Sequence, residues 1–375
     1  MYSQLKIKGF IMPITLNRAV VHELIKEKNI DPQPLNFRPS LLPTDNENVR
    51  NVIEGVIGIY GRKNNNARYG VFTNEAAYNT PNAFNKYSAL ADGTVDECFM
   101  EFSKTVMREL YREATGVPFA TGGHILFADY ENEGIRFFLA AMIKQKAGFA
   151  FSDTLGVENL EYIDLSKLHQ AIKINFEKYN AYQEAEEVDK LELTYLSFVS
   201  PQASQSTAGY FINAMGCKAG AHSAKATEAV IKESVIFFES RKELKQNAHA
   251  IKTDICLYLA EKSDNKESAT LADIEGIARN YFPTDTEELA DELADEFVTH
   301  LNSEDVGVPP EFPVNKARLK ALTHLIYRGK DLRLEFDKDD LGNNPNARVY
   351  FDGTQIIIKE LPDDLIKKLN DQINE

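Results

Sequence analysis

The chain lacks several features that mark secreted and membrane proteins. It has 375 residues, no tryptophan and three cysteines, Cys98, Cys217 and Cys256. An odd number of widely spaced cysteines argues against a disulfide-stapled secreted domain. No apolar run approaches the 18 residues of a membrane span, and residues 1–10 lack the pattern of a signal peptide. We therefore expect a cytoplasmic protein with no membrane partner.

Positive charge is also scarce. There are 42 Lys and Arg residues against 57 Asp and Glu, a net charge of −15. Nonspecific affinity for nucleic acid comes largely from cations that displace phosphate counterions. The excess of negative charge therefore argues against a protein that coats DNA nonspecifically. The excess is local: residues 151–310 carry 14 basic and 29 acidic side chains, whereas residues 1–150 carry 17 and 16, and residues 311–375 carry 11 and 12. A basic patch on either flank can still contact DNA.

The composition is that of a folded, soluble chain. Hydrophobic residues make up 43% and charged residues 26%, which are ordinary values for globular proteins, and the length suggests two or three domains. We predict an α+β fold in three parts. Residues 1–150 form an N-terminal mixed sheet with helices, residues 151–310 an acidic, mainly helical region, and residues 311–375 a basic helix with a β-hairpin.

Periodicity and capping signals place the elements of the first half. We expect an extended segment over residues 5–12, a strand or short helix over 19–25, and an amphipathic helix of about 15 residues opened by Thr44 or Asp45 and ended by Gly61. The apolar stripe of residues 95–114 predicts a second helix. Two β-rich runs, 120–130 and 135–143, predict a hairpin of central strands.

The second half is predicted to be helical and then β-rich. We expect a helix over residues 164–180, a strand over 193–199, and mainly helix from 203 to 300. Beyond the proline boundary at 309–313, Asn315 is predicted to cap a basic helix over residues 316–327. Strands are predicted over 331–336, 347–351 and 354–359, the last two joined by a two-residue type I′ turn at Asp352-Gly353.

Motifs that carry chemistry are scarce. There is no HExxH, CxxC, GxSxG or GxxxxGK[ST] pattern, and Thr121-Gly122-Gly123-His124 fits a tight bend before a strand better than a phosphate cradle. Cys217 and His222 are close enough in sequence for a nucleophilic thiolate–imidazole pair, although cysteine is more often a packing residue. We expect no catalytic residue, no metal and no cofactor, and an enzyme using this pair stays an alternative.

Two groups of cations are candidates for contact with DNA phosphates. The first lies in a loop rich in asparagine, and the second lies on and after the predicted basic helix. The candidates are Arg62, Lys63, Arg68, Lys316, Arg318, Lys320, Arg328, Lys330 and Arg333. For each group an ordinary solvated surface is the alternative.

A third candidate surface is acidic. Residues 284–297 combine many carboxylates with Leu289, Leu293 and Phe297 at helical spacing. Such a helix can dock a basic protein partner. The residues predicted to make that contact are Glu288, Asp291, Glu292 and Asp295.

Short runs spread over the whole chain resemble one known family. The clearest are NRAVVHELIK (17–26), RPSLL (38–42), YGVF (69–72), ATGGHILF (120–127), YID (162–164), YF (210–211), GC (216–217), FPV (312–314), LKALT (319–323), LRLEF (332–336), LG (341–342), IIIK (356–359) and LP (361–362). Their order is similar to that of the bacterial nucleoid-associated proteins of the YejK/NdpA type. The chain departs from that type in its acidic stretch 284–296, in extra residues near 153–160, and in lacking a long basic tail.

The resemblance implies a cytoplasmic protein on the nucleoid that acts on or near the chromosome, without a defining enzymatic activity. It supplies no catalytic residues. Combined with the charge pattern, it predicts weak, nonspecific DNA binding by a patch. The alternative is recruitment to the chromosome through a basic protein partner that docks on the acidic helical region. A homo-oligomer is compatible with either.

Overall fold

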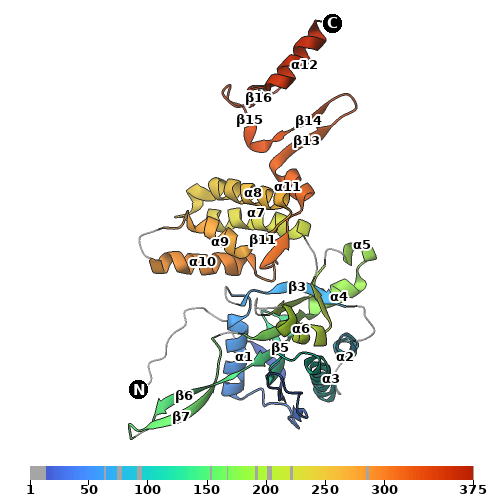
Figure 1. The fold of residues 1–375 in the computed structure, drawn as a ribbon, viewed down its shortest axis with the longest axis vertical. Coiled ribbons are helices and arrows are strands. Elements are labelled where there is room, and N and C mark those ends of the chain that lie inside the picture. Colours follow the sequence, from blue (N-terminus) through green and yellow to red (C-terminus); the bar gives the residue numbers. More distant parts are fainter. Residues whose placement is uncertain are drawn as a thin grey trace.

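The structure is a computed structural model of the chain, shown in Figure 1. It describes residues 14–374 except 63–64, 74–77, 91–94, 153, 167, 191–192, 201–204, 220–222 and 284–286. The predicted α+β class is confirmed. The extended segment predicted over residues 5–12 lies outside the described residues.

An eight-stranded antiparallel sheet forms the centre of the first body. In spatial order its strands are β10 (Cys217–Ala219), β3 (Arg68–Phe72), β9 (Leu196–Val199), β8 (Gln170–Asn175), β5 (Ile135–Ile143), β4 (Gly123–Asn132), β1 (Thr15–Leu24) and β2 (Asn36–Phe37). All of its strand pairings are antiparallel, so the prediction of a mixed sheet was wrong. The predicted central hairpin is confirmed as β4 and β5.

Helices cover both faces of this sheet, which explains the continuous apolar runs of its central strands. The helices that line one face are α2 (Asn79–Ser88), α3 (Val95–Thr115), α4 (Phe176–Glu184) and α6 (Gln205–Ala214). The other face is covered by α1 (Glu47–Ile59) (Figure 1). In β4, Ile125 and Phe127 belong to the core under α2, α3, α4 and α6, while Leu126 belongs to the core under α1. Because successive strand residues point to opposite faces, both sets are buried.

A second body consists of helices with a separate hydrophobic core. Its elements are α7 (Ser223–Glu239), α8 (Ala248–Asn265), α9 (Leu271–Arg279) and α10 (Glu287–Leu301), with the small strands β11 (Ser268–Thr270) and β12 (Glu311–Pro313). The short helix α11 (Lys316–Thr323) packs on α7 and α8. The domain limits near 150 and 310 stay a prediction.

A polar latch joins the two bodies just after α10. The Asn302 side chain accepts a hydrogen bond from the Ala67 N–H (2.6 Å) and donates to the carbonyl oxygens of Ala67 (2.8 Å) and Val308 (2.7 Å). Next to it, Glu304 forms ion pairs with Lys173 (2.8 Å) and Lys178 (3.5 Å). Asn302 is buried, so these bonds replace hydrogen bonds to water. They fix the residue just before β3 against the helical body.

Two segments project from these bodies (Figure 1). One is a two-stranded arm made of β6 (Gln145–Phe151) and β7 (Val157–Ile163). The other is the C-terminal segment after α11, which contains β13 (His324–Arg328), β14 (Arg333–Asp337), β15 (Leu341–Gly342), β16 (Val349–Phe351), β17 (Ile356–Ile358) and α12 (Asp363–Ile373). Both carry exposed apolar side chains, which makes them candidates for contact with other molecules.

Four local predictions need correction or refinement. Residues 164–180 are not one helix, because residues 170–175 pair with β5 and β9 as β8 and only then does α4 begin. The basic helix ends at Thr323, and the next five residues pair with β14. Asn46, rather than Thr44 or Asp45, caps α1. The last hairpin has a four-residue connection between Phe351 and Ile356 rather than a two-residue turn.

Candidate nucleic-acid interface

The β13–β14 hairpin holds the part of the second cation group that forms no ion pair among the described residues. Arg328 and Arg333 lie directly opposite one another at the end of the ladder, and Lys330 lies in the connecting turn. The turn is closed by a hydrogen bond from Gly329 N–H to the Leu332 carbonyl oxygen (2.8 Å). All three cations are exposed, and none takes part in an ion pair within the described part of the chain. They are therefore available to a ligand.

The hairpin has two distinct faces. Strand alternation places Arg328 and Arg333 on the same face as Ile326. The other face carries Tyr327 and Leu334, and the Tyr327 ring packs against Gly329 so closely that a Cβ there would lie 2.8 Å from a ring carbon. The glycine thus lets the ring brace the turn that presents the cations.

The cations on α11 are already neutralised by carboxylates. Lys316 pairs with Asp264 (2.8 Å), Lys320 pairs with Glu335, and the Arg318 Nε lies 2.9 Å from Glu228. Hydrogen bonds from Lys232 and Arg318 lower the pKa of Glu228, which keeps it charged. The predicted basic helix exists and is capped by Asn315 as expected. Its charges hold α11 onto α7 and α8 and hold β14 onto α11, which makes them weaker candidates for DNA contact.

The first cation group is divided by the structure. Arg62 and Arg68 are exposed, and Lys63 lies outside the described residues. Asn65 in this loop is buried, and its side-chain oxygen accepts a hydrogen bond from the Leu168 N–H (2.9 Å). This side chain therefore packs within the fold and is not presented to a ligand.

The two cation groups do not meet on one surface. The loop before β3 lies against the α10 end of the helical body through the Asn302 latch. The β13–β14 hairpin projects from the far side of that body, beyond α7 and α8 (Figure 1). The helical body separates them, so a single DNA contact cannot include both groups as they are placed here.

The acidic helix α10 presents part of the surface that the sequence suggested. Glu288, Asp291, Glu292 and Asp295 are exposed. Asp291 pairs with Arg279 of α9 at 2.8 Å. Leu293 and Phe297 were expected to contact a partner together with these carboxylates, but both are buried in the core of the helical body. Only the carboxylates, with Leu289 at the edge, remain for a partner.

The proposed thiolate–imidazole pair gains no support. His222 lies outside the described residues. Cys217 is in β10, and burial raises the pKa of its thiol well above the usual range. A thiol with a raised pKa stays protonated and is a poor nucleophile. The Cys217 side chain packs against the core of the sheet as an apolar residue.

The Thr121-Gly122-Gly123-His124 segment is a bend, as expected. The Gly122 N–H donates to the Lys26 carbonyl oxygen at 2.9 Å. A Cβ at residue 122 would lie 1.8 Å from the Leu24 carbonyl oxygen, so only glycine fits. This N–H is used within the fold, which removes it as a phosphate donor.

A buried histidine and serine are hydrogen-bonded to each other, but the histidine is the donor, which is the reverse of what catalysis requires. His22 Nε2 is 2.9 Å from Ser103 Oγ, and the Arg38 N–H donates to His22 Nδ1 (3.2 Å). Since Nδ1 accepts, Nε2 carries the proton and donates to the serine. Burial, with a smaller effect of Lys104, lowers the pKa of His22 to about 4. The pair is neutral and structural, because a general base would have to accept the serine proton.

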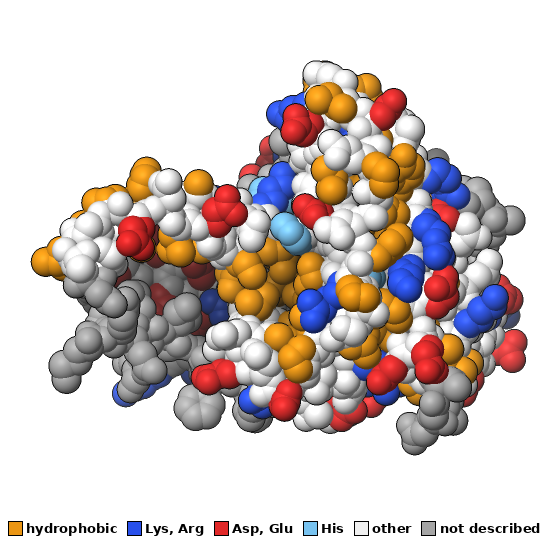
Figure 2. Space-filling view, turned by 90° about the horizontal axis from the view of Figure 1, so that it is seen from below, with side chains coloured by type: hydrophobic (Ala, Val, Ile, Leu, Met, Phe, Trp, Pro, Cys, Tyr) orange, Lys and Arg blue, Asp and Glu red, His pale blue; other side chains and the backbone are white. Residues whose placement is uncertain are grey.

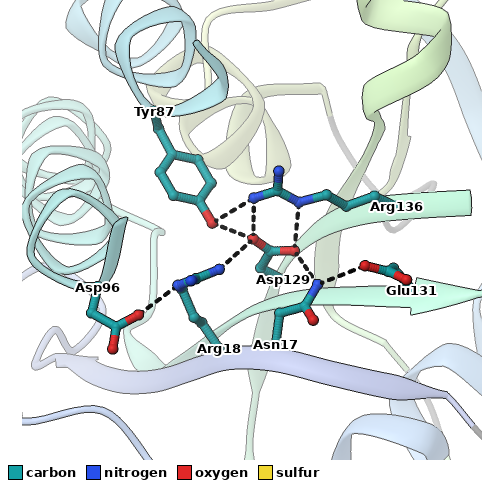
Figure 3. Close-up of polar contacts among 7 residues, drawn as sticks. All are labelled: Asn17, Arg18, Tyr87, Asp96, Asp129, Glu131 and Arg136. Carbon is teal, nitrogen blue, oxygen red and sulfur yellow. Dashed lines mark hydrogen bonds and ion pairs between the residues drawn. The ribbon is translucent and has the colours of Figure 1, made fainter. Parts of the chain in front are cut away.

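The densest polar cluster is built around the buried Asp129 (Figure 3). Arg136 donates two hydrogen bonds to its carboxylate (3.0 and 2.6 Å), Tyr87 donates to it from α2, and Arg18 lies 3.6 Å away. Burial and the Asp129 charge raise the pKa of Tyr87. Asn17 donates to the same carboxylate (3.3 Å), so its oxygens are used within the fold. The cluster fixes α2 against three strands.

No helix among the described residues has the length and apolarity needed to cross a bilayer. In the same part of the chain, no group of three or more His, Cys, Asp or Glu side chains is arranged to hold a metal ion.

Taken together, the fold and these surfaces define an α+β protein of two latched bodies, with three exposed cations on a projecting β-ribbon that form no ion pair among the described residues. A family model described as "Nucleoid-associated protein YejK" matches residues 20–366. The chain therefore belongs to the family of YejK nucleoid-associated proteins, which confirms the resemblance.

Relatives of the same length carry the same description. A "Nucleoid-associated protein" of Pseudomonas putida F1 is 25% identical over 362 residues, covering 96% of this chain and 98% of that protein. One from Metapseudomonas resinovorans is 25% identical over 364 residues, covering 96% and 99%. One from Pseudomonas aeruginosa UCBPP-PA14 is 25% identical over 370 residues, covering 97% and 100%. The similarity thus extends over almost the whole chain.

Proposed function

We propose that this protein is a nonenzymatic component of the nucleoid that binds DNA weakly through the β13–β14 hairpin. Membership of the nucleoid-associated family supports the setting. The observation that carries the proposal is the contrast between Arg328, Lys330 and Arg333, which are exposed without an ion pair in the described structure, and the paired cations of α11.

The shape of the hairpin fits this role. A two-stranded ribbon can enter the major groove of B-DNA, and arginine and lysine contact phosphates on its rim. Arg328 and Arg333 project from one face of the ribbon, as a pair of contacts to one backbone requires. With about three phosphate contacts, the binding is weak, depends strongly on salt and carries little sequence preference.

The test is a fluorescence anisotropy titration of the full chain with a duplex from about 50 to 200 mM salt. The three phosphate contacts of a single hairpin give a log–log slope of about −3 and a loss of roughly 40-fold in affinity over that range. The variant Arg328→Ala, Lys330→Ala, Arg333→Ala should bind with a slope near zero.

A matched control removes three other cations from the same C-terminal segment, the half-buried Lys359 and the exposed Lys367 and Lys368: Lys359→Ala, Lys367→Ala, Lys368→Ala. It makes the same change in net charge and should keep most of the slope. Equal effects of the two triple variants would show that net charge, and not the hairpin, matters. Absence of binding at about 50 mM salt would refute direct DNA contact.

A protein partner on α10 is the second candidate function. The observation in its favour is the exposed row of carboxylates at Glu288, Asp291, Glu292 and Asp295. Charge reversal at Glu288 and Glu292 avoids the Arg279 contact of Asp291 and should leave the fold intact. Loss of nucleoid localisation in cells, with unchanged DNA binding in vitro, would favour this route. Unchanged localisation would exclude it.

A further inference from the structure

The β6–β7 arm carries an apolar face that nothing in the described structure covers. The two strands pair over seven residues each, from Gln145 opposite Ile163 to Phe151 opposite Val157. On one face Phe149 is 77% exposed, Phe151 is 76% exposed and Val157 is 66% exposed, and the same face carries the polar residues Asn159 and Glu161 nearer the base. An isolated two-stranded hairpin is marginal in water, and a contiguous exposed apolar face marks an interaction site.

Polar contacts close the base of the arm by joining the start of β6 to the end of β7. The Asp164 N–H donates to the Lys144 carbonyl oxygen at 3.0 Å, and Lys146 pairs with the Asp164 carboxylate at 2.7 Å. Hydrogen bonds from Lys146 and Ser166 lower the pKa of Asp164, which keeps it charged. On the opposite face of the arm the Tyr162 ring packs over Gly148. Leu160 and Tyr162 on that face are 45% and 46% exposed, less than the apolar side chains of the Phe149 face.

An apolar groove lies at the foot of the same face. It has a volume of about 290 Å³, and Figure 2 shows apolar side chains gathered in the hollow between the arm and the rest of the body. The groove exists because α1 covers only part of its side of the sheet. Its apolar lining comes from β1, the segment before α1, α1, β4, β5 and the arm itself: Val21, Leu42, Val49, Val52, Leu126, Ile143 and Ile163.

Arm and groove are complementary but cannot meet within one chain. Phe151 lies six residues from the base of β6, which at about 3.3 Å per residue places it roughly 20 Å from the groove mouth. The arm would have to fold back on itself to fill its own groove. In a second copy the same groove can receive it, and a two-fold axis then makes the exchange mutual.

We propose that two copies of this chain form a symmetric dimer in which the apolar face of each β6–β7 arm packs into the groove beside α1 of the other copy. The area favours a second copy over an unrelated partner. Phe149, Phe151, Val157 and neighbouring apolar residues expose roughly 500 Å² per arm. Two arms and their two receiving surfaces bury roughly 1,600–2,000 Å², the size of a stable interface, whereas one arm in one partner buries about half.

Sedimentation velocity of the full chain tests this directly. The wild type should sediment as a dimer at about 10–50 μM, and the variant Phe149→Ser, Phe151→Ser should sediment as a monomer with an unchanged circular dichroism spectrum. The matched control is Ile236→Ser, Leu257→Ser, which removes two exposed apolar side chains from α7 and α8. It should remain dimeric. A wild type that is monomeric at about 100 μM, or a dimer that the arm variant leaves intact, overturns the proposal.

Disulfide trapping distinguishes arm exchange from arm-to-arm packing. A chain with Phe151→Cys is mixed with a chain with Leu42→Cys, both in a background in which Cys98, Cys217 and Cys256 are replaced by Ala or Ser. Arm exchange predicts a cross-linked heterodimer under mild oxidation, in preference to either homodimer. Cross-linking of only the Phe151→Cys chains to each other would overturn the proposed mode.

Discussion

At the scale of single residues, the two buried polar clusters described above stabilise the fold. His22 and Ser103 form a neutral hydrogen-bonded pair inside the sheet–helix core, and Asp129 gathers Arg18, Arg136 and Tyr87 at one point. A buried polar group without a partner is costly, so each of these residues depends on the others. The Asp129 cluster could not be predicted from sequence, because its members lie far apart along the chain; only Asn17 and Arg18 fall in a run that resembles the family.

Protonation of His22 should destabilise the fold in acid. Its pKa is about 4 in the folded protein and about 6.5 when unfolded. The folded value is the lower one, so the contribution of His22 is complete above about 6.5 and is lost as the pH falls towards 4, by at most about 1.4 kcal/mol per pH unit. Urea unfolding at pH 7.5 and 5.0 measures the loss. In His22→Gln this component of the pH dependence should vanish, and an identical dependence would contradict the assignment.

Removal of the Asp129 carboxylate should cost much more than removal of its exposed neighbour. Asp129→Ala leaves two arginines without their buried counter-ion, and we expect a loss of about 3–5 kcal/mol in the free energy of unfolding. Asp96 also bonds Arg18, at 2.6 Å, but its side chain is 70% exposed. Asp96→Ala should cost less than about 1 kcal/mol by urea unfolding. Similar losses for both variants would show that the cluster does not act as a buried network.

At the scale of elements, long periodic segments were predictable and pairing partners were not. The 95–114 helix and the 120–143 hairpin were confirmed because local apolar periodicity alone specifies them. The 164–180 helix and the extended basic helix were wrong. Residues 170–175 and 324–328 become strands because distant strands supply hydrogen bonds, which no local pattern reveals.

The latch after α10 should determine whether the two bodies unfold together. Asn302→Ala removes the two hydrogen bonds that join Asn302 to Ala67 and a third to Val308. The Ala67 N–H and carbonyl oxygen are then left without this partner. Each body has its own core, so we expect one calorimetric transition in the wild type and two in the variant. Asn370→Ala, on the exposed α12, is the control and should unfold as the wild type does. A single transition in Asn302→Ala would show that other contacts couple the bodies.

At the scale of the whole molecule, charge and assembly act together. The hairpin of one copy offers about three cations to DNA, and a dimer held by its arms offers two hairpins. Two sites on one assembly bind more tightly than either alone. The two proposals therefore make a joint prediction.

The salt slope of DNA binding should depend on the arm as well as on the hairpin. In the dimer the log–log slope should approach about −5, and Phe149→Ser, Phe151→Ser should return it to about −3. The hairpin variant should abolish the slope while the protein remains dimeric. Anisotropy titrations at matched protein concentrations measure both. An unchanged slope in the arm variant would separate dimer formation from DNA binding.

The sequence by itself determined the α+β class, the family, the acidic middle and the cap of the basic helix, because composition, periodicity and local hydrogen bonding are properties of neighbouring residues. Only the tertiary structure decided which charges are available. It paired Lys316, Arg318 and Lys320 with carboxylates distant in sequence, buried Leu293 and Phe297, and left Phe149 and Phe151 of the arm exposed. Exposure and ion pairing depend on which distant residues the fold brings together, and that information is absent from any single stretch of the chain.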